Sequence, residues 1–401
     1  MQETLSHYFG YKSFRPGQEE IITKILNHQH TLGVLPTGGG KSICYQVPGL
    51  MQGGTTIVIS PLISLMKDQV DQLQAMGIQA AYLNSSLTHK QQKEIEEQIK
   101  RGAIQFLYVA PERFENTFFL NLLRKIEIPL IAFDEAHCIS KWGHDFRPSY
   151  QSVIQKVFTL PQHFTIVALT ATATAEVQQD IMSKLSIGQN DVVKTSTKRR
   201  NLIFKVNPTY QRQKFVVDYV ANHEGQAGII YCSTRKQVEE LHEALNSEKI
   251  KSTIYHAGLT NKERIEAQND FLYDRVEVVI ATNAFGMGID KSNVRYVIHY
   301  NMPGDLESYY QEAGRAGRDG LKSECILLFS ERDKGLHEYF ITVSQADDDY
   351  KDKMGEKLTK MIQYTKTKKC LEATIVHYFE PNENLEAVSY THLRAHETGR
   401  N

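Results

Sequence analysis

Three consecutive glycines followed by Lys41 and Ser42 form the stretch of this sequence with the clearest chemistry. They follow apolar residues 31–35, which predict a buried strand, and they precede residues 43–47, which predict the start of a helix. In that context successive backbone N–H groups point into one concavity and can hold phosphate groups. Lys41 would contact the outer phosphates of a nucleoside triphosphate, and the Ser42 hydroxyl would help to hold Mg²⁺. The predicted phosphate-binding residues are Thr37, Gly38, Gly39, Gly40, Lys41 and Ser42.

The strict phosphate-loop pattern starts with a glycine, but Leu35 stands at that position. The alternative is a glycine-rich turn that happens to end in Lys-Ser. Three glycines in a row lose backbone entropy when they are ordered, and a turn without a ligand gains nothing from them. We therefore interpret residues 36–42 as a phosphate loop.

Asp134 and Glu135, followed by Ala136 and His137, come directly after an apolar run that ends at Phe133. Ligands of open parallel sheets bind at the carboxyl ends of such strands. Transfer of a phosphoryl group to water needs one carboxylate near the metal ion and a second group that orients or deprotonates the water. Asp134 suits the first role and Glu135 the second. An isolated acidic pair is usually solvated, but the phosphate loop upstream favours catalysis.

The segment from Gln311 to Asp319 places Arg315 and Arg318 three residues apart. A helix would put both on one face, and a solvated basic face is the alternative. The glycines within the segment weaken a helix and favour close approach of the backbone to another surface. An arginine supplied to a γ-phosphate by a separate lobe can raise the hydrolysis rate by about 10³–10⁵.

Apolar runs alternate with helix-like stretches such as residues 88–101. The runs that predict strands are 31–35, 55–60, 104–109, 129–133, 164–169, 228–232, 276–280, 294–298 and 326–329. Such a pattern predicts parallel sheets covered by helices on both faces, and hence an α/β fold. We expect two lobes joined near residue 200, where Lys194, Lys198, Arg199 and Arg200 cluster. Only the first lobe has a glycine loop ending in Lys-Ser, so we predict one site of nucleotide hydrolysis.

The predicted domains are an N-terminal lobe over residues 1–197, a second lobe over 198–335, a helical region over 336–388 and a non-native tail over 389–401. Residues 347–350 are a charge run, interpreted as a solvated helix start or a loop. Residues 354–369 and 370–379 predict two helices whose apolar stripes pack together.

The composition argues against a secreted protein with a disulfide framework and against a protein that spans a membrane. A net charge of −1 leaves any polyanion to be held by local patches. The five cysteines are scattered without a C-x-x-C pair, which favours a reducing compartment over a disulfide framework. No secretion signal is evident, and no apolar run approaches the ~20 residues of a membrane span. We expect a cytoplasmic protein that has no membrane partner.

Residues 138–148 contain the only tryptophan of the chain and directly follow the acidic pair. Trp142 and Phe146 offer faces on which unpaired bases could stack, and His144 and Arg147 add polar and cationic contacts. The alternative is that the two aromatic residues anchor a loop. Their charged and polar neighbours favour the stacking role.

Together these motifs resemble the RecQ family of superfamily 2 helicases from about residue 5 to about 380. The resemblance implies two RecA-like lobes and a short helical hairpin, with ATP and Mg²⁺ as cofactors. It identifies residues 138–148 with the loop that senses single-stranded DNA, 168–173 with motif III and 279–290 with motif V. By resemblance, the catalytic residues are Lys41, Asp134, Glu135, His137, Gln311, Arg315 and Arg318. Tyr11, Arg15 and Gln18 would bind adenine, Gly288 and Asp290 would contact ATP, and Lys67, Trp142, His144, Phe146 and Arg147 would contact DNA.

The activity implied is that of an ATP-dependent 3′–5′ DNA helicase acting in recombination and repair, in the bacterial cytoplasm and at the nucleoid. Its expected partners are single-stranded and tailed duplex DNA. Two alternatives stay open: an RNA helicase of the same superfamily, and a DNA-stimulated ATPase that does not unwind. One departure concerns zinc, which the family holds with four cysteines. Cys370 matches the first ligand and the other three are absent, so we expect an incomplete zinc site.

Overall fold

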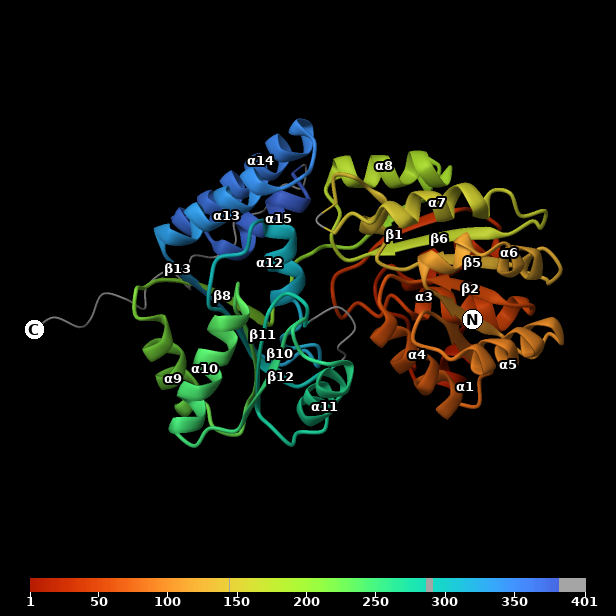
Figure 1. Cartoon of the computed structure of the whole chain (residues 1–401). Coiled ribbons are helices and arrows are strands. Elements are labelled where there is room, and N and C mark those ends of the chain that lie inside the picture. The colour runs from red at the N-terminus through yellow and green to blue at the C-terminus, as the bar shows by residue number, and fades with distance from the viewer. Residues whose placement is uncertain (144, 286–290, 382–401) are drawn as a thin grey trace, which may run out of the picture. The chain divides into compact units, whose positions relative to one another are not determined.

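The computed structural model describes residues 1–143, 145–285 and 291–381 (Figure 1). The chain divides into two compact units, Met1–Ser196 and Thr197–Asn401, and each contains one sheet of parallel strands. The predicted α/β class with two parallel-sheet lobes is therefore confirmed. The expected non-native tail lies outside the described residues.

The first unit is built on a seven-stranded sheet in the order β3-β4-β2-β5-β6-β1-β7. Its strands are β1 (Thr31–Val34), β2 (Thr56–Ile59), β3 (Ala80–Leu83), β4 (Phe106–Val109), β5 (Leu130–Phe133), β6 (Thr165–Thr170) and β7 (Val192–Lys194). Its helices are α1 (Gln2–Phe9), α2 (Gln18–Leu26), α3 (Ile43–Gln52), α4 (Ile63–Ala75), α5 (His89–Lys100), α6 (Thr117–Leu123), α7 (Pro148–Val157) and α8 (Ala175–Leu185).

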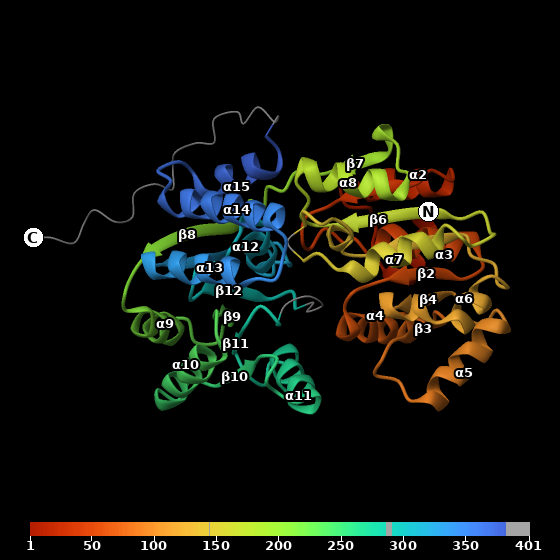
Figure 2. The same ribbon diagram turned by 45° about the horizontal axis from the view of Figure 1, so that its top comes forward.

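Alternation of side chains along each strand fills a core on either face of this sheet. Ile57 and Ile59 pack with residues of α6, α7 and α8, whereas Val58 packs with residues of α2, α3 and α4. Both faces are covered by helices, as the near-continuous apolar strands predicted. Figure 2 shows α7 and α8 along one side of this sheet. Local signals set the helix starts: Thr88 and Gln91 form a capping box at the start of α5.

The second unit has six parallel strands in the order β10-β11-β9-β12-β13-β8. They are β8 (Leu202–Pro208), β9 (Ala227–Tyr231), β10 (Ser252–Tyr255), β11 (Val278–Ala281), β12 (Val294–His299) and β13 (Ser323–Phe329). Its helices are α9 (Arg212–Ala221), α10 (Arg235–Ser247), α11 (Asn261–Leu272), α12 (Leu306–Ala313), α13 (Glu331–Val343), α14 (Asp348–Lys366) and α15 (Leu371–Phe379). Residues of α9 and α10 pack on one face of the sheet, and residues of α12, α14 and α15 on the other.

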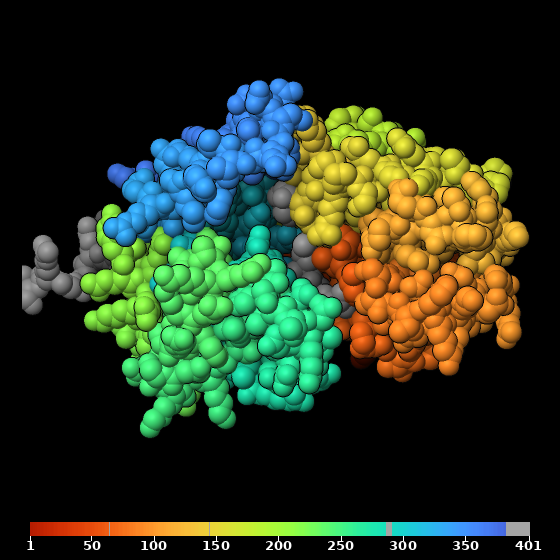
Figure 3. All heavy atoms as spheres, in the orientation of Figure 1, coloured from red at the N-terminus to blue at the C-terminus, as the bar shows by residue number. Residues whose placement is uncertain are grey.

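The C-terminal helices belong to the core of the second unit. Leu358 and Met361 of α14 and Ile375 and Phe379 of α15 are buried in the same cluster, which confirms the predicted packing of the two stripes. Asp347 caps α14 by accepting the Tyr350 N–H at 2.9 Å, so the charge run is a helix start. In the space-filling view the blue surface of these helices covers one side of the second unit (Figure 3). Among the described residues, no helix combines the length and apolarity needed to cross a bilayer.

Candidate active site

The first sheet brings three loops to one edge. Strands β5, β6 and β1 are consecutive neighbours and run parallel, so the loops that follow them leave the sheet at the same end. These loops carry Asp134, Thr172 and Lys41, respectively. Two of the loops are joined where the Leu35 N–H donates to the Thr170 carbonyl at 3.0 Å. Residues that are far apart in the chain therefore meet where an open α/β sheet binds its ligands.

The phosphate loop, residues 36–42, connects β1 to α3. Gly38 and Gly40 have φ angles of 81° and 72°, which side chains would strain. Leu35 is fully buried and packs in the same core cluster as Tyr45 of α3. The position that a strict pattern gives to glycine thus belongs to the core beneath the loop.

Two residues near the start of α2 contact the phosphate loop directly, a contact that sequence reasoning missed. Arg15 donates to a loop carbonyl, and Gln18 Nε2 donates to the carbonyls of Gly39 and Gly40 at 3.1 and 2.9 Å. Gln18 is buried, and its Oε1 accepts the Arg15 N–H at 2.8 Å. Tyr11, the third residue predicted to bind adenine, is 52% exposed. Two of the three residues predicted to bind the base, Arg15 and Gln18, therefore also support the loop predicted to bind the phosphates.

Asp134 is a buried carboxylate at the carboxyl end of β5. Burial, and then the neighbouring Glu135, raise the pKa of Asp134 to about 7, while Lys41 opposes this rise. The Asp134 carboxylate accepts the Glu135 N–H at 3.0 Å. A buried carboxylate that shares its edge of the sheet with the Ser42 hydroxyl fits the oxygen ligands that Mg²⁺ takes. These residues are suited to hold the ion, whose charge would favour the ionised carboxylate.

The acidic pair continues into a tight turn that buries His137. Glu135 has a left-handed φ of 47° and begins the 3₁₀ helix η2 (Ala136–Ile139). The Nδ1 atom of His137 lies 3.1 Å from Thr170 Oγ1 and 3.4 Å from a carboxylate oxygen of Glu135. The histidine thus contacts both the residue predicted to orient water and the end of β6, within the segment likened to motif III.

The residues that follow η2, up to Gly143, fold back against this turn. The Gly143 N–H donates to the Ser140 carbonyl at 3.0 Å. A Cβ atom on Gly143 would lie only 2.2 Å from the carbonyl oxygen of His137. Only glycine fits this approach without a shift of the backbone, so the segment lies directly on the predicted catalytic turn.

The described side chains between residues 141 and 147 are partly buried and make contacts within the first unit. Trp142 packs against the core, and Lys141 Nζ lies 5.4 Å from the centre of its ring. Arg147 donates to the Asp145 carboxylate at 3.0 and 3.2 Å and to the Pro61 carbonyl at 3.0 Å. The last contact joins the segment to Pro61, just before α4, the helix that carries Lys67.

The other predicted DNA contacts in the first unit are less constrained. Phe146 is half-buried, and Lys67 is exposed and pairs with Asp71 at 2.8 Å. The predicted residues that lie outside the described part of the chain are His144, Gly288 and Asp290.

The predicted arginine segment of the second unit begins in the last turn of α12, and Arg315 and Arg318 lie in the loop that follows. Gln311 and Arg315 are buried, and Arg318 is half-buried. Arg315 lies beside Tyr231 at the end of β9: burial raises the pKa of Tyr231, and the charge of Arg315 opposes that rise. Burial beside a tyrosine restricts the orientations that Arg315 can take.

Three protein families match successive parts of the chain: DEAD/DEAH box helicase over residues 15–181, helicase conserved C-terminal domain over 211–320, and RecQ zinc-binding over 331–387. The chain is 49% identical over 383 residues to "ATP-dependent DNA helicase RecQ" of Bacillus subtilis, which covers 95% of this chain and 65% of the relative. It is 44% identical over 351 residues to "Probable ATP-dependent DNA helicase RecS" of the same organism, which covers 86% and 70%.

The chain belongs to the RecQ family of superfamily 2 helicases. It spans about 60–65% of the length of the first RecQ relatives that it matches. Solved structures share the fold at low identity. The helicase MrfA bound to DNA has a TM-score of 0.69 at 17% identity, covering 86% of this chain and 51% of that one. Dbp5 of S. cerevisiae bound to RNA has a TM-score of 0.67 at 19% identity, covering 89% and 97%.

The residues present do not complete the zinc site of the family. Residues 331–387 match the RecQ zinc-binding family, yet Cys370 is their only cysteine. In the described ranges, the one group of potential metal ligands comprises His137, Cys138 and Asp145, which belong to the first unit and not to this region. A single thiolate cannot form a tetrahedral four-cysteine site, so we assign zinc no role in this chain.

Proposed function

We propose that this chain is the motor of an ATP-dependent DNA helicase that moves 3′ to 5′ on single-stranded DNA and unwinds duplexes in recombination and repair. The observation that supports this most directly is the close approach of Gly143 to the His137 carbonyl. It leaves no spacer between the segment predicted to contact DNA and the turn predicted to hydrolyse ATP. Occupation of that segment by a base would therefore shift the catalytic turn.

The proposed roles follow the two units. Lys41 and Ser42 hold the phosphates and the Mg²⁺ ion, with Asp134 as a further ligand of the ion. Glu135 orients the attacking water, and its position is set by His137. When bound there, Mg²⁺ would supply positive charge that offsets the charge of the phosphates. Arg315 and Arg318 would stabilise the charge that develops on the γ-phosphate.

The proposed domain bounds are 1–197 and 198–335 for the two RecA-like lobes and 336–388 for the helical region. The proposed nucleic-acid partners are single-stranded and tailed duplex DNA, at the nucleoid of a bacterial cytoplasm. We propose base stacking on Trp142 and Phe146 as the contact that tolerates any DNA sequence.

A DNA-stimulated ATPase that does not unwind is the second candidate. The isolated Cys370 favours it, because the zinc module of the family is incomplete in this chain. An RNA helicase is the third. Proteins of this fold have been solved with DNA and with RNA, so the fold alone does not choose between them.

One experiment separates these candidates. ATP hydrolysis is measured without nucleic acid, with single-stranded DNA and with single-stranded RNA, beside unwinding of a 3′-tailed duplex. We expect stimulation by DNA and unwinding that both disappear in Lys41→Ala. Stimulation by RNA alone would select the RNA helicase, and stimulation by DNA without unwinding would select the ATPase. Hydrolysis that survives Lys41→Ala would reject the assigned phosphate loop.

A further inference from the structure

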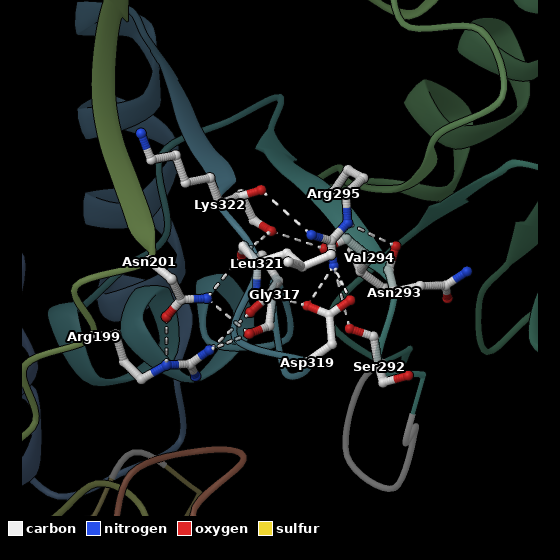
Figure 4. Close-up of polar contacts among 12 residues, drawn as sticks. Arg199, Asn201, Ser292, Asn293, Val294, Arg295, Gly317, Asp319, Leu321 and Lys322 are labelled. Carbon is white, nitrogen blue, oxygen red and sulfur yellow. Dashed lines mark hydrogen bonds and ion pairs between the residues drawn. The ribbon is translucent and has the colours of Figure 1, made fainter.

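The basic cluster at residues 194–200 has no part in the proposed function, and one of its members, Arg199, donates hydrogen bonds to another loop of the second unit. Arg200 is exposed, whereas Arg199 is half-buried. Figure 4 shows the Arg199 side chain directed at the loop that follows α12. That loop carries Arg315 and Arg318.

Arg199 donates hydrogen bonds to three backbone carbonyls of this loop. Its Nη1 donates to the Gly314 carbonyl at 3.3 Å, and its Nη2 donates to the carbonyls of Ala316 and Gly317 at 3.1 and 2.8 Å. Carbonyls at the end of a helix lack intrahelical partners and carry partial negative charge, so a cation is favourable there. The rigid fork of a guanidinium can satisfy several such acceptors at once.

Asn201 extends this contact to the far end of the loop. Its Nδ2 donates to the Gly317 carbonyl at 2.8 Å and to the Leu321 carbonyl at 3.0 Å. The backbone carbonyl of Asn201 accepts the Ser323 N–H at 2.9 Å. Gly317 has a φ of 57°, and a Cβ atom there would lie 2.4 Å from Asn201 Nδ2. The glycine that sequence reasoning linked to close backbone approach is therefore the point where Asn201 meets the loop.

The chain at residues 292–295 holds the loop from the opposite side (Figure 4). Arg295 Nη2 donates to both carboxylate oxygens of Asp319 at 2.7 and 2.6 Å. The Gly317 N–H donates to the Val294 carbonyl at 2.9 Å, and the Asp319 N–H to the Ser292 carbonyl at 3.3 Å. The backbone between Gly314 and Leu321 is thus fixed at both flanks.

We propose that Arg199 and Asn201 are positioning residues for the arginines of this loop. They hold the backbone that carries Arg315 and Arg318, so these guanidinium groups are oriented before charge develops on the γ-phosphate. Preorganised charges stabilise a transition state without reorganising during the reaction. The inference rests on the proposed function, under which Arg315 or Arg318 contacts that phosphate, whereas Arg199 itself binds protein carbonyls.

The test compares Arg199→Ala with Arg200→Ala, a change of the same charge at the adjacent exposed position. Steady-state ATP hydrolysis is measured with saturating single-stranded DNA. We expect kcat of Arg199→Ala to fall about 10–100-fold, because a small displacement of a catalytic group costs that much. KM for ATP and the DNA concentration for half-maximal stimulation should not change, and Arg200→Ala should match the unaltered protein. Arg199→Lys should give an intermediate kcat, since it keeps the charge but not the fork.

Two outcomes would overturn the proposal. One is an unchanged kcat in Arg199→Ala. The other is a normal kcat at saturating DNA together with weaker, more salt-sensitive DNA binding, which would assign Arg199 to DNA. Should Arg199→Ala not fold, Asn201→Ser supplies the same kinetic comparison.

Amide hydrogen exchange gives a readout independent of hydrolysis. In Arg199→Ala, exchange should rise at residues 314–321 and stay unchanged in the first unit, and equal exchange in both proteins would refute the proposal. Absence of ATP hydrolysis in the unaltered protein would instead reject the proposed function, while the exchange result would still judge the role of Arg199.

Discussion

Asp134 shows how a single residue combines a cost to folding with a proposed role in function. Ionising a carboxyl group in a buried site is unfavourable, and Lys41 offsets only part of that cost. A hard divalent cation would complete the compensation, since it is the largest local charge a site can contain. The raised pKa thus describes a site that is unfavourable when empty of cations.

Without Mg²⁺, the protein should lose stability as pH rises from about 4 to about 7. The folded state keeps a proton on Asp134 up to about pH 7, whereas the unfolded chain releases it near the ordinary value of 3.8, so the folded state binds more protons in this window. Asp134→Asn should remove this loss and stabilise the protein at pH 8 by on the order of 1–4 kcal/mol.

Urea denaturation in EDTA at several pH values measures this effect. Asp71→Asn is the control, because Asp71 is an exposed partner of Lys67 and such surface pairs contribute about 0–1 kcal/mol. Equal pH slopes for Asp134→Asn and the unaltered protein would contradict the assignment.

At the scale of an element, the described part of the segment 138–148 packs on the core through Trp142 and lies against the predicted catalytic turn at Gly143. Gly143→Ala would place a Cβ atom 2.2 Å from the His137 carbonyl oxygen, so the backbone must move. We expect a loss of about 1–3 kcal/mol in unfolding free energy and at least about tenfold weaker stimulation by DNA.

Gly355→Ala provides the matched control, because a Cβ atom added to that glycine inside α14 would meet no atom beyond its own stretch of helix backbone within 4 Å. This substitution should stabilise the protein by about 0.5–1 kcal/mol and leave hydrolysis unchanged. Stimulation that is normal in Gly143→Ala would disprove the tight link between the segment and the turn.

Trp142→Ala tests whether the tryptophan of this segment only packs on the core or also contributes to the stimulation of ATP hydrolysis by DNA. The ring is only partly buried, so we expect a stability loss of about 1–3 kcal/mol, which is less than for a fully buried tryptophan. Hydrolysis without DNA should persist and stimulation by DNA should disappear. Trp142→Phe should recover part of the stimulation, since it keeps an aromatic face. Normal stimulation of the alanine variant would make this residue a structural anchor.

At the scale of the whole molecule, each unit is stabilised by its own hydrophobic cores. The C-terminal helices join the core of the second unit through Leu358, Met361 and Phe379. We therefore expect purified protein to contain no stoichiometric zinc and to keep its melting temperature in EDTA. Elemental analysis and thermal denaturation with and without chelator measure this. One zinc per chain would show that Cys370 has partners this structure does not identify.

The interior of both sheets could be predicted from sequence, and their edges could not. Every strand that was not predicted, namely β3, β7, β8 and β10, lies at an edge of its sheet. Interior strands are covered on both faces and read as continuous apolar runs. An edge strand is less enclosed: β10 is only partly buried throughout, and β8 mixes exposed and buried residues. Helix α13 was also missed, because its residues are largely exposed and give no clear apolar stripe.

The candidate site also contains residues that the sequence predicts and contacts that it does not. Lys41, Asp134 and Arg315 could be predicted because each lies in a short local pattern whose chemistry is evident. The contacts of Gln18 with the phosphate loop and of Arg199 with Gly317 join residues distant in sequence, and only the folded chain brings them together. For the contact of Arg199 with Gly317, the glycines of the segment from Gln311 to Asp319 were the one local indication in the sequence.

The bonds from Gln18 and Arg15 to the phosphate loop have a consequence for how this enzyme could change over evolution. Under the proposed roles, the same two side chains select the base and brace the loop that receives the phosphates. A substitution that made base recognition less selective would also weaken binding of the phosphates of any nucleoside triphosphate. Acceptance of a new nucleotide thus requires compensating changes in the loop, and this dependence tends to preserve the preference for ATP.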